Sequence, residues 1–439
     1  MNVDVLVVGA GPAGLSAARE LRRLAVGSVL VADREAEPGG IPRHSRHTGY
    51  GLRDLHRIMT GPAYARALAD AAVAAGVELR VGTTVTCCVP GVGDGTGAGD
   101  GLGAGDRPVS GDGPGSGHAV TMTSSRGIET VRAGVVLLAT GCRERPRTAR
   151  LVPGDRPAGV MTTGELQQRV YLGHERRPGR ALVVGAEHVS FSAVVTLEHA
   201  GAEVVALVTE YERQQSYAAF RVGAALRWRV PVWTSTAVRR VDGRERLAGV
   251  EVADLRTGAA RFIPCDTLVF TADWIPDHEL ARHAGLDMDP GTRGPAVDTL
   301  LRTSAAGVFA AGNLVHAAET ADIAALSGRH AARQIAAVLG DTACVAARVP
   351  VRVEPPLRWI SPNVIAVAPG RPAASPPLGR FVLRSQEFRR VARLEARQGG
   401  RLLARSGAAR LIPGRPVHLG AGWLARVDPV GGFVQILVV

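Results

Sequence analysis

The sequence contains no lysine, so all 52 of its basic residues are arginine. A chain without lysine cannot form the lysine Schiff base of a pyridoxal phosphate enzyme, and it cannot build a Walker-type phosphate loop. The 40 acidic residues leave a formal net charge of +12. Because the arginines are scattered and no basic run carries interleaved aromatic residues, we expect no nucleic acid partner.

Cysteine is also scarce. The chain has five, which are Cys87, Cys88, Cys142, Cys265 and Cys344. No two of them have CxxC spacing, and they form no longer set of metal ligands. This spacing argues against an iron–sulfur cluster, a structural zinc site and a disulfide framework. We therefore predict no metal site.

Long apolar runs are absent. No segment approaches the roughly 18–20 apolar residues of a membrane-spanning helix, so we expect no membrane span. A strand-like run begins at Val3, which leaves no room for a leader and favours a cytoplasmic location. A chain of 439 residues is too long to form a single ordinary hydrophobic core, so two or three domains are expected.

The most specific motif lies at the start of the chain. An apolar run from Val3 is followed directly by Gly9-x-Gly11-x-x-Gly14 and then by a helical pattern, and a second apolar run ends at Asp33. Gly9 allows a tight turn, Gly11 lets the backbone approach a pyrophosphate, and Gly14 lets the helix pack close to the strand. Asp33 is placed to accept hydrogen bonds from a ribose. In this context the motif predicts a dinucleotide-binding Rossmann unit.

The rest of the first part contains one unusual segment. A helix is expected near residues 62–75 and a strand near residues 77–81. Residues 90–117 consist mostly of Gly, Asp and Ser and cannot form a core. We interpret them as a disordered loop inserted between two strands of a small sheet, with a functional lid as the alternative. Strand patterns resume at residues 119–123 and 134–139.

A second βαβ unit begins near residue 180. Residues 180–185 and 203–208 have strand patterns, and residues 187–200 between them fit a helix that Gly201 ends. A turn signal at residues 256–258 indicates a strand meander, whose strands would be residues 237–241, 249–253 and 267–271.

The composition changes after about residue 349. From there the chain has Pro, Arg and short alternating strands, and residues 398–401, QGGR, are typical of a hairpin turn. These features predict a small β-rich C-terminal region.

Several further segments resemble one family. VVLLATG at residues 135–141, TADWIP at 271–276, AVDTLLRTS at 296–304 and GVFAAGN at 307–313 follow the opening GAGPAG. Together they resemble the flavoproteins with two dinucleotide-binding domains, which form the pyridine nucleotide-disulfide oxidoreductase superfamily in its broad sense. The resemblance covers roughly residues 3–339.

This resemblance implies an α/β fold with two Rossmann-like dinucleotide-binding domains of the three-layer ββα type. The second domain is inserted in the first, and a small β-rich C-terminal region follows. The FAD-binding domain would comprise residues 1–150 and 285–345, and the second, NAD(P)-binding-like domain residues 151–284. Residues 346–439 would form the C-terminal domain.

The resemblance also implies which residues contact FAD. They come from the opening motif, the turn after the second strand, the ATG strand and the GVFAAGN segment. The residues are Gly9, Gly11, Pro12, Ala13, Gly14, Asp33, Arg34, Gly40, Thr140, Gly141, Gly312, Asn313 and Thr320.

Residues 38–51 have the sequence PGGIPRHSRHTGYG and indicate a narrower group within this family. They resemble a subgroup of FAD-dependent dehydrogenases without a redox disulfide, which includes flavin subunits of hydrogen cyanide synthase and of opine and proline dehydrogenase complexes. Disulfide reductases carry CxxxxC at this place, whereas residues 44–48 here are HSRHT, so dithiol chemistry is excluded. The resemblance implies a second flavin subunit and a small iron–sulfur protein as partners.

The sequence departs from the family pattern at four positions. The second Gly-rich turn keeps only Gly185, while Glu187 brings a negative charge toward the expected pyrophosphate and Ser190 replaces the packing glycine. Asp273 stands where glycine is usual, and Asn313 replaces the usual Asp of the last flavin motif. NAD(P)H binding therefore stays open, and the alternative is a second domain that has kept its fold but lost the nucleotide.

The candidate catalytic residues are His44 and His47, because the segment that holds them passes near the flavin by analogy. A histidine with a pKa near neutral suits proton transfer. Tyr50 follows closely, and Arg43 or Arg46 would clamp a substrate carboxylate or phosphate. The alternative is that these loop residues contact FAD phosphates or solvent.

A second group, at the expected start of the helix after Gly312, comprises His316, Glu319, Thr320 and Asp322. These residues would contact substrate or tune the flavin, or the acids would only complement the helix dipole.

Together these features predict an FAD-dependent oxidoreductase without a redox-active disulfide. We expect a dehydrogenase subunit that oxidises a small amine, imino acid or hydroxy compound by hydride transfer to the flavin. The alternatives are a stand-alone NAD(P)H-dependent flavoprotein reductase and a non-catalytic, flavin-binding scaffold subunit.

Overall fold

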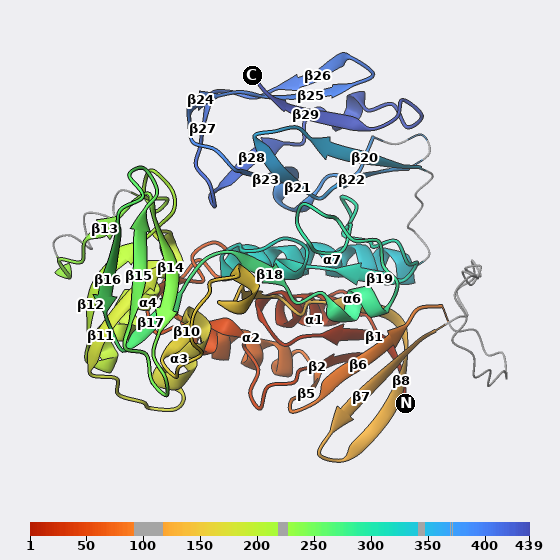
Figure 1. Ribbon diagram of the computed structural model, residues 1–439. Coiled ribbons are helices and arrows are strands. Elements are labelled where there is room, and N and C mark those ends of the chain that lie inside the picture. The colour runs from red at the N-terminus through yellow and green to blue at the C-terminus, as the bar shows by residue number, and fades with distance from the viewer. Residues whose placement is uncertain (92–116, 218–226, 341–346, 369, 371) are drawn as a thin grey trace, which may run out of the picture.

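The computed structural model describes residues 1–91, 117–217, 227–340, 347–368, 370 and 372–439. The loop interpreted at residues 90–117 therefore lies almost wholly outside the described residues. The described chain forms a mixed sheet and a parallel sheet, each with flanking helices, and an all-β C-terminal region (Figure 1). Among the described residues, no helix is long and apolar enough to span a membrane.

The first sheet has the strand order β5-β2-β1-β8-β7-β6, and β19 adds to β8. Its strands are β1 (Asn2–Val8), β2 (Val29–Ala32), β5 (Glu78–Arg80), β6 (Thr84–Val89), β7 (His118–Ser124), β8 (Gly127–Leu138) and β19 (Val308–Ala310). Strands β5, β2, β1, β8 and β19 run parallel, whereas β8, β7 and β6 form an antiparallel meander. Val5, Leu6 and Val7 have no exposed surface, which is typical of a parallel strand covered on both faces.

The long strand β8 joins the two parts of this sheet. Its first half pairs with β7, and its second half lies between β1 and β19. The sequence pattern indicated only the second half, because the first half faces solvent on one side and includes exposed residues such as Ile128. The return of β19 to β8 after the second sheet confirms that the second domain is inserted in the first.

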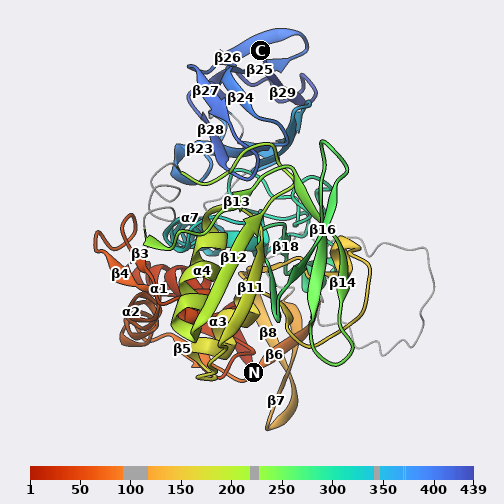
Figure 2. The same cartoon turned by 60° about the vertical axis from the view of Figure 1, so that its left-hand side comes forward.

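Two helices of the first sheet pack closely together. They are α1 (Pro12–Arg23) and α7 (Ala321–Leu339). A Cβ added at Gly328 would lie 2.0 Å from the carbonyl oxygen of Ala13, so only glycine permits this approach. Both views show α7 between the first sheet and the C-terminal region (Figures 1 and 2).

Several further elements follow the first βαβ unit. They are η1 (Ile41–His44), β3 (Thr48–Tyr50), β4 (Met59–Thr60), α2 (Gly61–Ala74) and, near the end of the domain, α6 (Glu279–His283) and η3 (Gly312–Leu314). Helix α2 packs against α1 and η1.

The second sheet is parallel throughout, in the order β10-β17-β11-β12-β13. Its strands are β10 (Val160–Thr162), β11 (Gly179–Val184), β12 (Ala202–Val208), β13 (Val232–Trp233) and β17 (Thr267–Phe270), and its helices are α3 (Thr163–Tyr171) and α4 (His188–Ala200). Gly201 ends α4 with a φ of 86°, as the sequence predicted.

One strand of the predicted meander was assigned to the wrong sheet. The antiparallel sheet consists of β14 (Thr236–Asp242), β15 (Gly249–Asp254) and β16 (Ala260–Pro264). The turn at residues 256–258 leads into β16, which the sequence analysis missed, and the predicted third strand is β17 of the parallel sheet. Only one residue of β16 is buried, so it lacks a strong apolar pattern, whereas β17 is buried throughout.

The two sheets are linked by a pair of short antiparallel strands. They are β9 (Cys142–Glu144) and β18 (Trp274–Pro276), with Glu144 opposite Trp274. Strand β9 follows the ATG segment, and β18 precedes the return of the chain to the first sheet. This pair places Glu144 at the junction of the two sheets.

The C-terminal region has three small sheets. They are β22-β20-β29-β25-β26, β21-β23-β28 and β24-β27. The strands are β20 (Ala347–Val353), β21 (Leu357–Ser361), β22 (Val364–Val367), β23 (Arg380–Ser385), β24 (Arg389–Ala392), β25 (Leu394–Gln398), β26 (Arg401–Arg405), β27 (Ala409–Leu411), β28 (Pro416–Gly420) and β29 (Val434–Val438). Gly399 and Gly400, with φ of 55° and 82°, form the predicted hairpin turn between β25 and β26.

Candidate functional site

The opening glycine motif forms a cradle at the end of β1. Gly9 has a φ of 108°, and a Cβ added there would lie 2.5 Å from the carbonyl oxygen of Ala139. A Cβ at Gly14 would lie 1.9 Å from the carbonyl oxygen of Gly9. At Gly11, by contrast, no atom of the described residues lies within 4 Å of an added Cβ. The backbone is therefore closely packed behind the turn and open in front of it.

Helix α1 begins in this cradle. Gly11 is its N-cap, Pro12 its first residue, and no described side chain caps it. The open space before Gly11 and the free N–H groups of a helix N-terminus suit a pyrophosphate. These residues fit the dinucleotide that the sequence predicts.

Asp33 is hydrogen-bonded to the same turn. Its Oδ2 accepts a hydrogen bond from the N–H of Ala10 at 2.5 Å, and its Oδ1 accepts one from the N–H of Glu35 at 2.8 Å. Each carboxylate oxygen keeps a further lone pair for a ribose hydroxyl. The guanidinium of Arg34 pairs with Asp277 at 3.3 Å, and its side chain is largely exposed.

Other predicted contacts gather around the cradle. The N–H of Gly39 donates to the carbonyl of Ala10 at 2.8 Å, and a Cβ added at Gly40 would lie 3.0 Å from the Cα of Gly11. A Cβ at Gly312 would lie 2.7 Å from the Cβ of Ala13, so η3 also approaches α1. Thr140 and Gly141 come from the chain just after β8, where the Thr140 hydroxyl donates to the carbonyl of Asp277 at 2.8 Å.

Asn313 closes the loop that follows η3. Its Nδ2 donates to the carbonyl of Glu319 at 3.2 Å, and its Oδ1 accepts from the N–H of Glu319 at 2.9 Å. The amide side chain thus holds the backbone of this loop in both directions. A carboxylate could not make the donating bond, which gives Asn a structural reason at this position.

The residues expected at the start of the following helix lie partly in the loop before it. Helix α7 begins only at Ala321, with Thr320 as N-cap. His316 and Glu319 lie in the preceding loop, which corrects our placement of them on the helix. The Thr320 hydroxyl donates to the Asp322 carboxylate.

The two candidate catalytic histidines have opposite environments. His44 is 4% exposed, and burial, with the charge of Arg43 as a smaller cause, lowers its pKa to about 4. It contacts Gln167 of α3, and its Nδ1 has no hydrogen-bond partner among the described residues. His47 is exposed, with its ring stacked on Tyr50 at 5.2 Å between centroids.

Glu144 is a buried acid that the sequence analysis missed. Its Oε2 accepts the N–H of Gly164 at the N-terminus of α3, at 2.7 Å, and its residue is 7% exposed. Burial raises the pKa of Glu144 to about 7, although hydrogen bonds from Gly164, Thr163 and Thr162 act to lower it. The only sequence signal was a charged residue in the short strand after the ATG segment.

In the second sheet, Glu187 occupies the helix terminus that corresponds to the cradle of α1. It is the N-cap of α4, and its Oε2 accepts the N–H of Ser190 at 3.3 Å and the Ser190 hydroxyl at 2.6 Å. Ser190 returns a hydrogen bond, since its Oγ accepts the N–H of Glu187 at 3.3 Å. Burial raises the pKa of Glu187.

The segment at residues 215–217 also covers this turn. The N–H groups of Gln215 and Ser216 donate to the carbonyl of Ala186 at 3.1 and 3.2 Å. The Tyr217 ring lies 4.4 Å from the His188 ring, and the guanidinium of Arg415 lies 4.2 Å from the centre of the Tyr217 ring. The C-terminal region therefore reaches the second Gly-rich turn.

Comparison with known proteins agrees with this geometry. The family model described as pyridine nucleotide-disulphide oxidoreductase matches residues 104–328, and one described as NAD(P)-binding Rossmann-like domain matches residues 7–73. Sarcosine oxidase subunit alpha of Corynebacterium sp. (strain P-1) is 36% identical over 258 residues, which are 58% of this chain and 24% of that protein. The probable ferredoxin reductase CtmF of Castellaniella defragrans is 26% identical over 321 residues, covering 71% of this chain and 68% of that protein.

Among solved structures, thioredoxin reductase of T. acidophilum is similar in fold, with a TM-score of 0.58 and 20% identity. The alignment covers 77% of this chain and 99% of the reductase. The chain spans about a quarter of the sarcosine oxidase subunit that it resembles. Because the first family match alone covers more than half of the chain, the protein belongs to the pyridine nucleotide-disulphide oxidoreductase family and is an FAD-dependent oxidoreductase.

Proposed function

We propose that the protein is a dehydrogenase subunit that oxidises a small amine, imino acid or hydroxy compound and passes the electrons to a protein partner, without using NAD(P)H. The observation that carries this proposal is the position of Glu187 at the N-terminus of α4. In a dinucleotide-binding domain this helix end holds the pyrophosphate. Here a carboxyl group of the chain itself takes the N–H of Ser190.

Two physical effects oppose a nucleotide at this place. Where Glu187 is ionised, a pyrophosphate charge about 4 Å away would be repelled by roughly 4 kcal/mol at an effective dielectric constant near 20. Where Glu187 is protonated, its oxygen still occupies the N–H of Ser190. The loop at Gln215 and Ser216 adds a steric cover, because both residues bond to the carbonyl of Ala186.

FAD, in contrast, suits the first cradle. We propose that the N-terminus of α1 at Gly11 and Pro12 holds the pyrophosphate and that Asp33 holds the adenosine ribose. Thr140, Gly141, Gly312, Asn313 and Thr320, with Ala13, Gly40 and Arg34, would complete the FAD site. The bound flavin would supply the hydride acceptor, while the chain positions substrate and moves protons.

His44 is the better placed of the two histidines for proton transfer. It is neutral at physiological pH because burial lowers its pKa to about 4, and its buried Nδ1 has no hydrogen-bond partner among the described residues. His47 lies on the surface and stacks on Tyr50. We propose that His44 contacts the substrate and that His47 only stabilises its own loop.

The similarity to sarcosine oxidase subunit alpha supports an amine substrate and a multi-subunit assembly. Partners of the kind that the sequence resemblance implies, a second flavin subunit and a small iron–sulfur protein, would accept the electrons. The alternative, a stand-alone NAD(P)H-dependent reductase, is favoured by the similarity to a probable ferredoxin reductase.

Anaerobic reduction of the purified, FAD-loaded protein distinguishes the two functions. We expect no flavin bleaching with NADH or NADPH, and bleaching with a member of a panel of secondary amines, amino acids, opines and polyols. The Glu187→Gln variant, which removes the charge but keeps the shape, should also stay oxidised with NADH because the loop still covers the turn. Rapid bleaching of the unmodified protein by either nicotinamide would overturn the proposal.

A further inference from the structure

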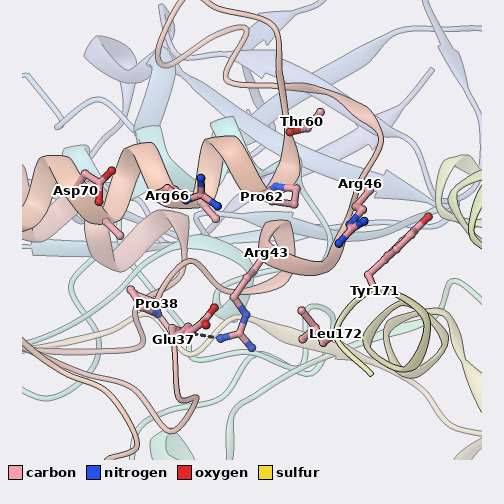
Figure 3. A pocket seen from close by; sticks show the side chains of 12 residues that line it. Glu37, Pro38, Arg43, Arg46, Thr60, Pro62, Arg66, Asp70, Tyr171 and Leu172 are labelled. Atoms are coloured by element: carbon pink, nitrogen blue, oxygen red, sulfur yellow. Dashed lines mark hydrogen bonds between the residues drawn. The ribbon is translucent and has the colours of Figure 1, made fainter. Parts of the chain in front are cut away.

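One cavity in the described part of the molecule lies outside the FAD cradle. It has a volume of about 560 Å³ and lies where α2, η1 and the C-terminal end of α3 meet. Figure 3 shows three arginines around it, with Arg43 reaching from η1, Arg46 from the loop after it and Arg66 from α2. Pockets of this volume commonly hold small organic ligands.

The charges around the cavity favour an anion. Arg43 is anchored, because its Nη2 pairs with Glu35 at 3.1 Å and its Nη1 donates to the carbonyl of Glu37 at 2.7 Å. Its Nε is buried and has no hydrogen-bond partner among the described residues. Arg46 and Arg66 form no ion pair with any described residue, and both line the cavity. Asp70 is the opposing acid that lines the cavity besides Glu37.

The backbone adds to this positive potential. Helix α2 begins at the cavity, where Thr60 and Pro62 form part of the lining. No described side chain caps this helix and its first turn contains no acid, while the N–H of Gly61 donates to the carbonyl of Ser45 at 3.1 Å. A 14-residue helix directs its positive dipole end toward such a place. The site thus combines a helix N-terminus with three guanidinium groups, one of which has a buried donor without a partner.

A flat surface completes the cavity. The guanidinium of Arg46 lies 5.3 Å from the centre of the Tyr171 ring, and Tyr171 and Leu172 of the second sheet's α3 segment form the opposite wall. A stacked guanidinium keeps its edge N–H groups free for bidentate bonds to phosphate oxygens. The apolar wall offers space for the organic part of a ligand.

We propose that this cavity binds the phosphate group of a small organic phosphate of about mononucleotide size. Arg46 and Arg66 bind the phosphate, Arg43 adds its positive charge beside them, and Tyr171 and Leu172 contact the organic part. The proposal does not depend on the substrate or the electron acceptor proposed above.

The wall of this cavity also touches the FAD cradle. The N–H of Gly39 donates to the carbonyl of Ala10, and Gly40 packs against Gly11, while Pro38 and Arg43 line the cavity. A ligand in the cavity would hold one side of the segment whose other side supports the flavin site.

Isothermal titration of the FAD-saturated full chain with adenosine monophosphate tests the proposal. Saturation with FAD blocks the cradle of α1 as a competing site. We expect adenosine monophosphate to bind, adenosine to bind at least about tenfold more weakly, and inorganic phosphate to bind more weakly than the nucleotide, since each lacks one half of the recognised group.

The variants Arg46→Ala and Arg66→Ala should each weaken binding by about tenfold, because a hydrogen bond between charged groups is lost. Arg239→Ala on β14, an exposed arginine remote from the cavity, is the matched control and should bind normally. The flavin spectrum of all three variants should be unchanged, which separates loss of the ligand from loss of the fold. Absence of saturable binding, equal binding of inorganic phosphate and nucleotide, or equal affinity in all three variants would overturn the proposal.

Discussion

Arg384 of β23 and Glu319, in the loop before α7, form a buried ion pair. Nη2 of Arg384 donates to Oε1 of Glu319 at 2.9 Å, and the two side chains are 7% and 9% exposed. The same nitrogen donates to the carbonyl of Ala318 at 3.0 Å, and Asn313 holds the Glu319 backbone from the other side. The C-terminal region is thereby tied to the loop that connects Gly312 with α7.

Arg384→Ala should destabilise the protein by about 3 kcal/mol, because it leaves the buried Glu319 carboxylate without its partner. The comparison variant is Arg389→Ala. The ion pair of Arg389 with Glu387 joins two side chains that are each 53% exposed, so its loss should change stability by less than about 1 kcal/mol. Thermal unfolding of both variants measures the difference. Equal melting temperatures would show that the pair contributes nothing.

Two of the three glycines of the first cradle predict different defects. Gly11→Glu should prevent FAD binding but leave the fold intact, because the new side chain enters open space and brings a negative charge to the pyrophosphate. Gly14→Ala should destabilise the fold by about 2 kcal/mol or more, because its Cβ would lie 1.9 Å from a carbonyl oxygen. Flavin absorbance and thermal unfolding distinguish the two. A yellow Gly11→Glu protein would refute the assignment of the cradle.

Glu144 predicts a pH dependence of stability. Burial raises its pKa to about 7 from a reference of 4.5, so the folded state binds this proton more tightly than the unfolded state. Stability should therefore fall as pH rises from about 4.5 to about 7, by roughly 3 kcal/mol for this group alone.

The Glu144→Gln variant isolates this contribution, because Gln does not titrate and its carbonyl oxygen still accepts the N–H of Gly164. Denaturant unfolding near pH 5 and near pH 8 should show the variant gaining stability relative to the unmodified protein at the higher pH. An equal difference at both pH values would mean that Glu144 titrates normally.

Glu187→Ala should cost about 1 kcal/mol, since it removes the N-cap of α4 and its reciprocal bonds with Ser190. The loss should not create NADH binding, because Gln215 and Ser216 still bond to the carbonyl of Ala186. Thermal unfolding and NADH titration of the same sample test both statements. Tight NADH binding by this variant would show that the loop is no barrier.

His44→Ala and His47→Ala should both retain FAD, since neither lies in the first cradle. We expect turnover with an identified substrate to fall at least about a hundredfold for His44→Ala, the usual scale of general acid–base catalysis, and to change little for His47→Ala. Steady-state kinetics with flavin content as control provide the measurement. Full activity of His44→Ala would exclude it from proton transfer.

Local patterns in the sequence were sufficient to predict several turns and helix ends. The GxGxxG turn, the acid at Asp33 and the Gly201 helix end depend on a few adjacent residues, because backbone dihedrals and close approaches require particular side chains there. The same holds for the hairpin at Gly399 and Gly400.

Strand β16 and the start of α7 were not predicted correctly, because local apolar pattern did not decide them. Strand β16 has one buried residue and exists through its pairing with β15. His316 and Glu319 stay off the helix because Asn313 and Arg384 hold the loop before it.

The sequence by itself determined the family, the flavin-binding unit and the altered second turn, because these are properties of contiguous residues. Only the tertiary structure decided that Glu187 caps α4, that Glu144 is buried at the junction of the sheets, and that Arg384 reaches Glu319 across 65 positions of the chain. Hydrogen bonds, burial and pKa depend on which residues the fold brings together, and neither composition nor spacing specifies those neighbours.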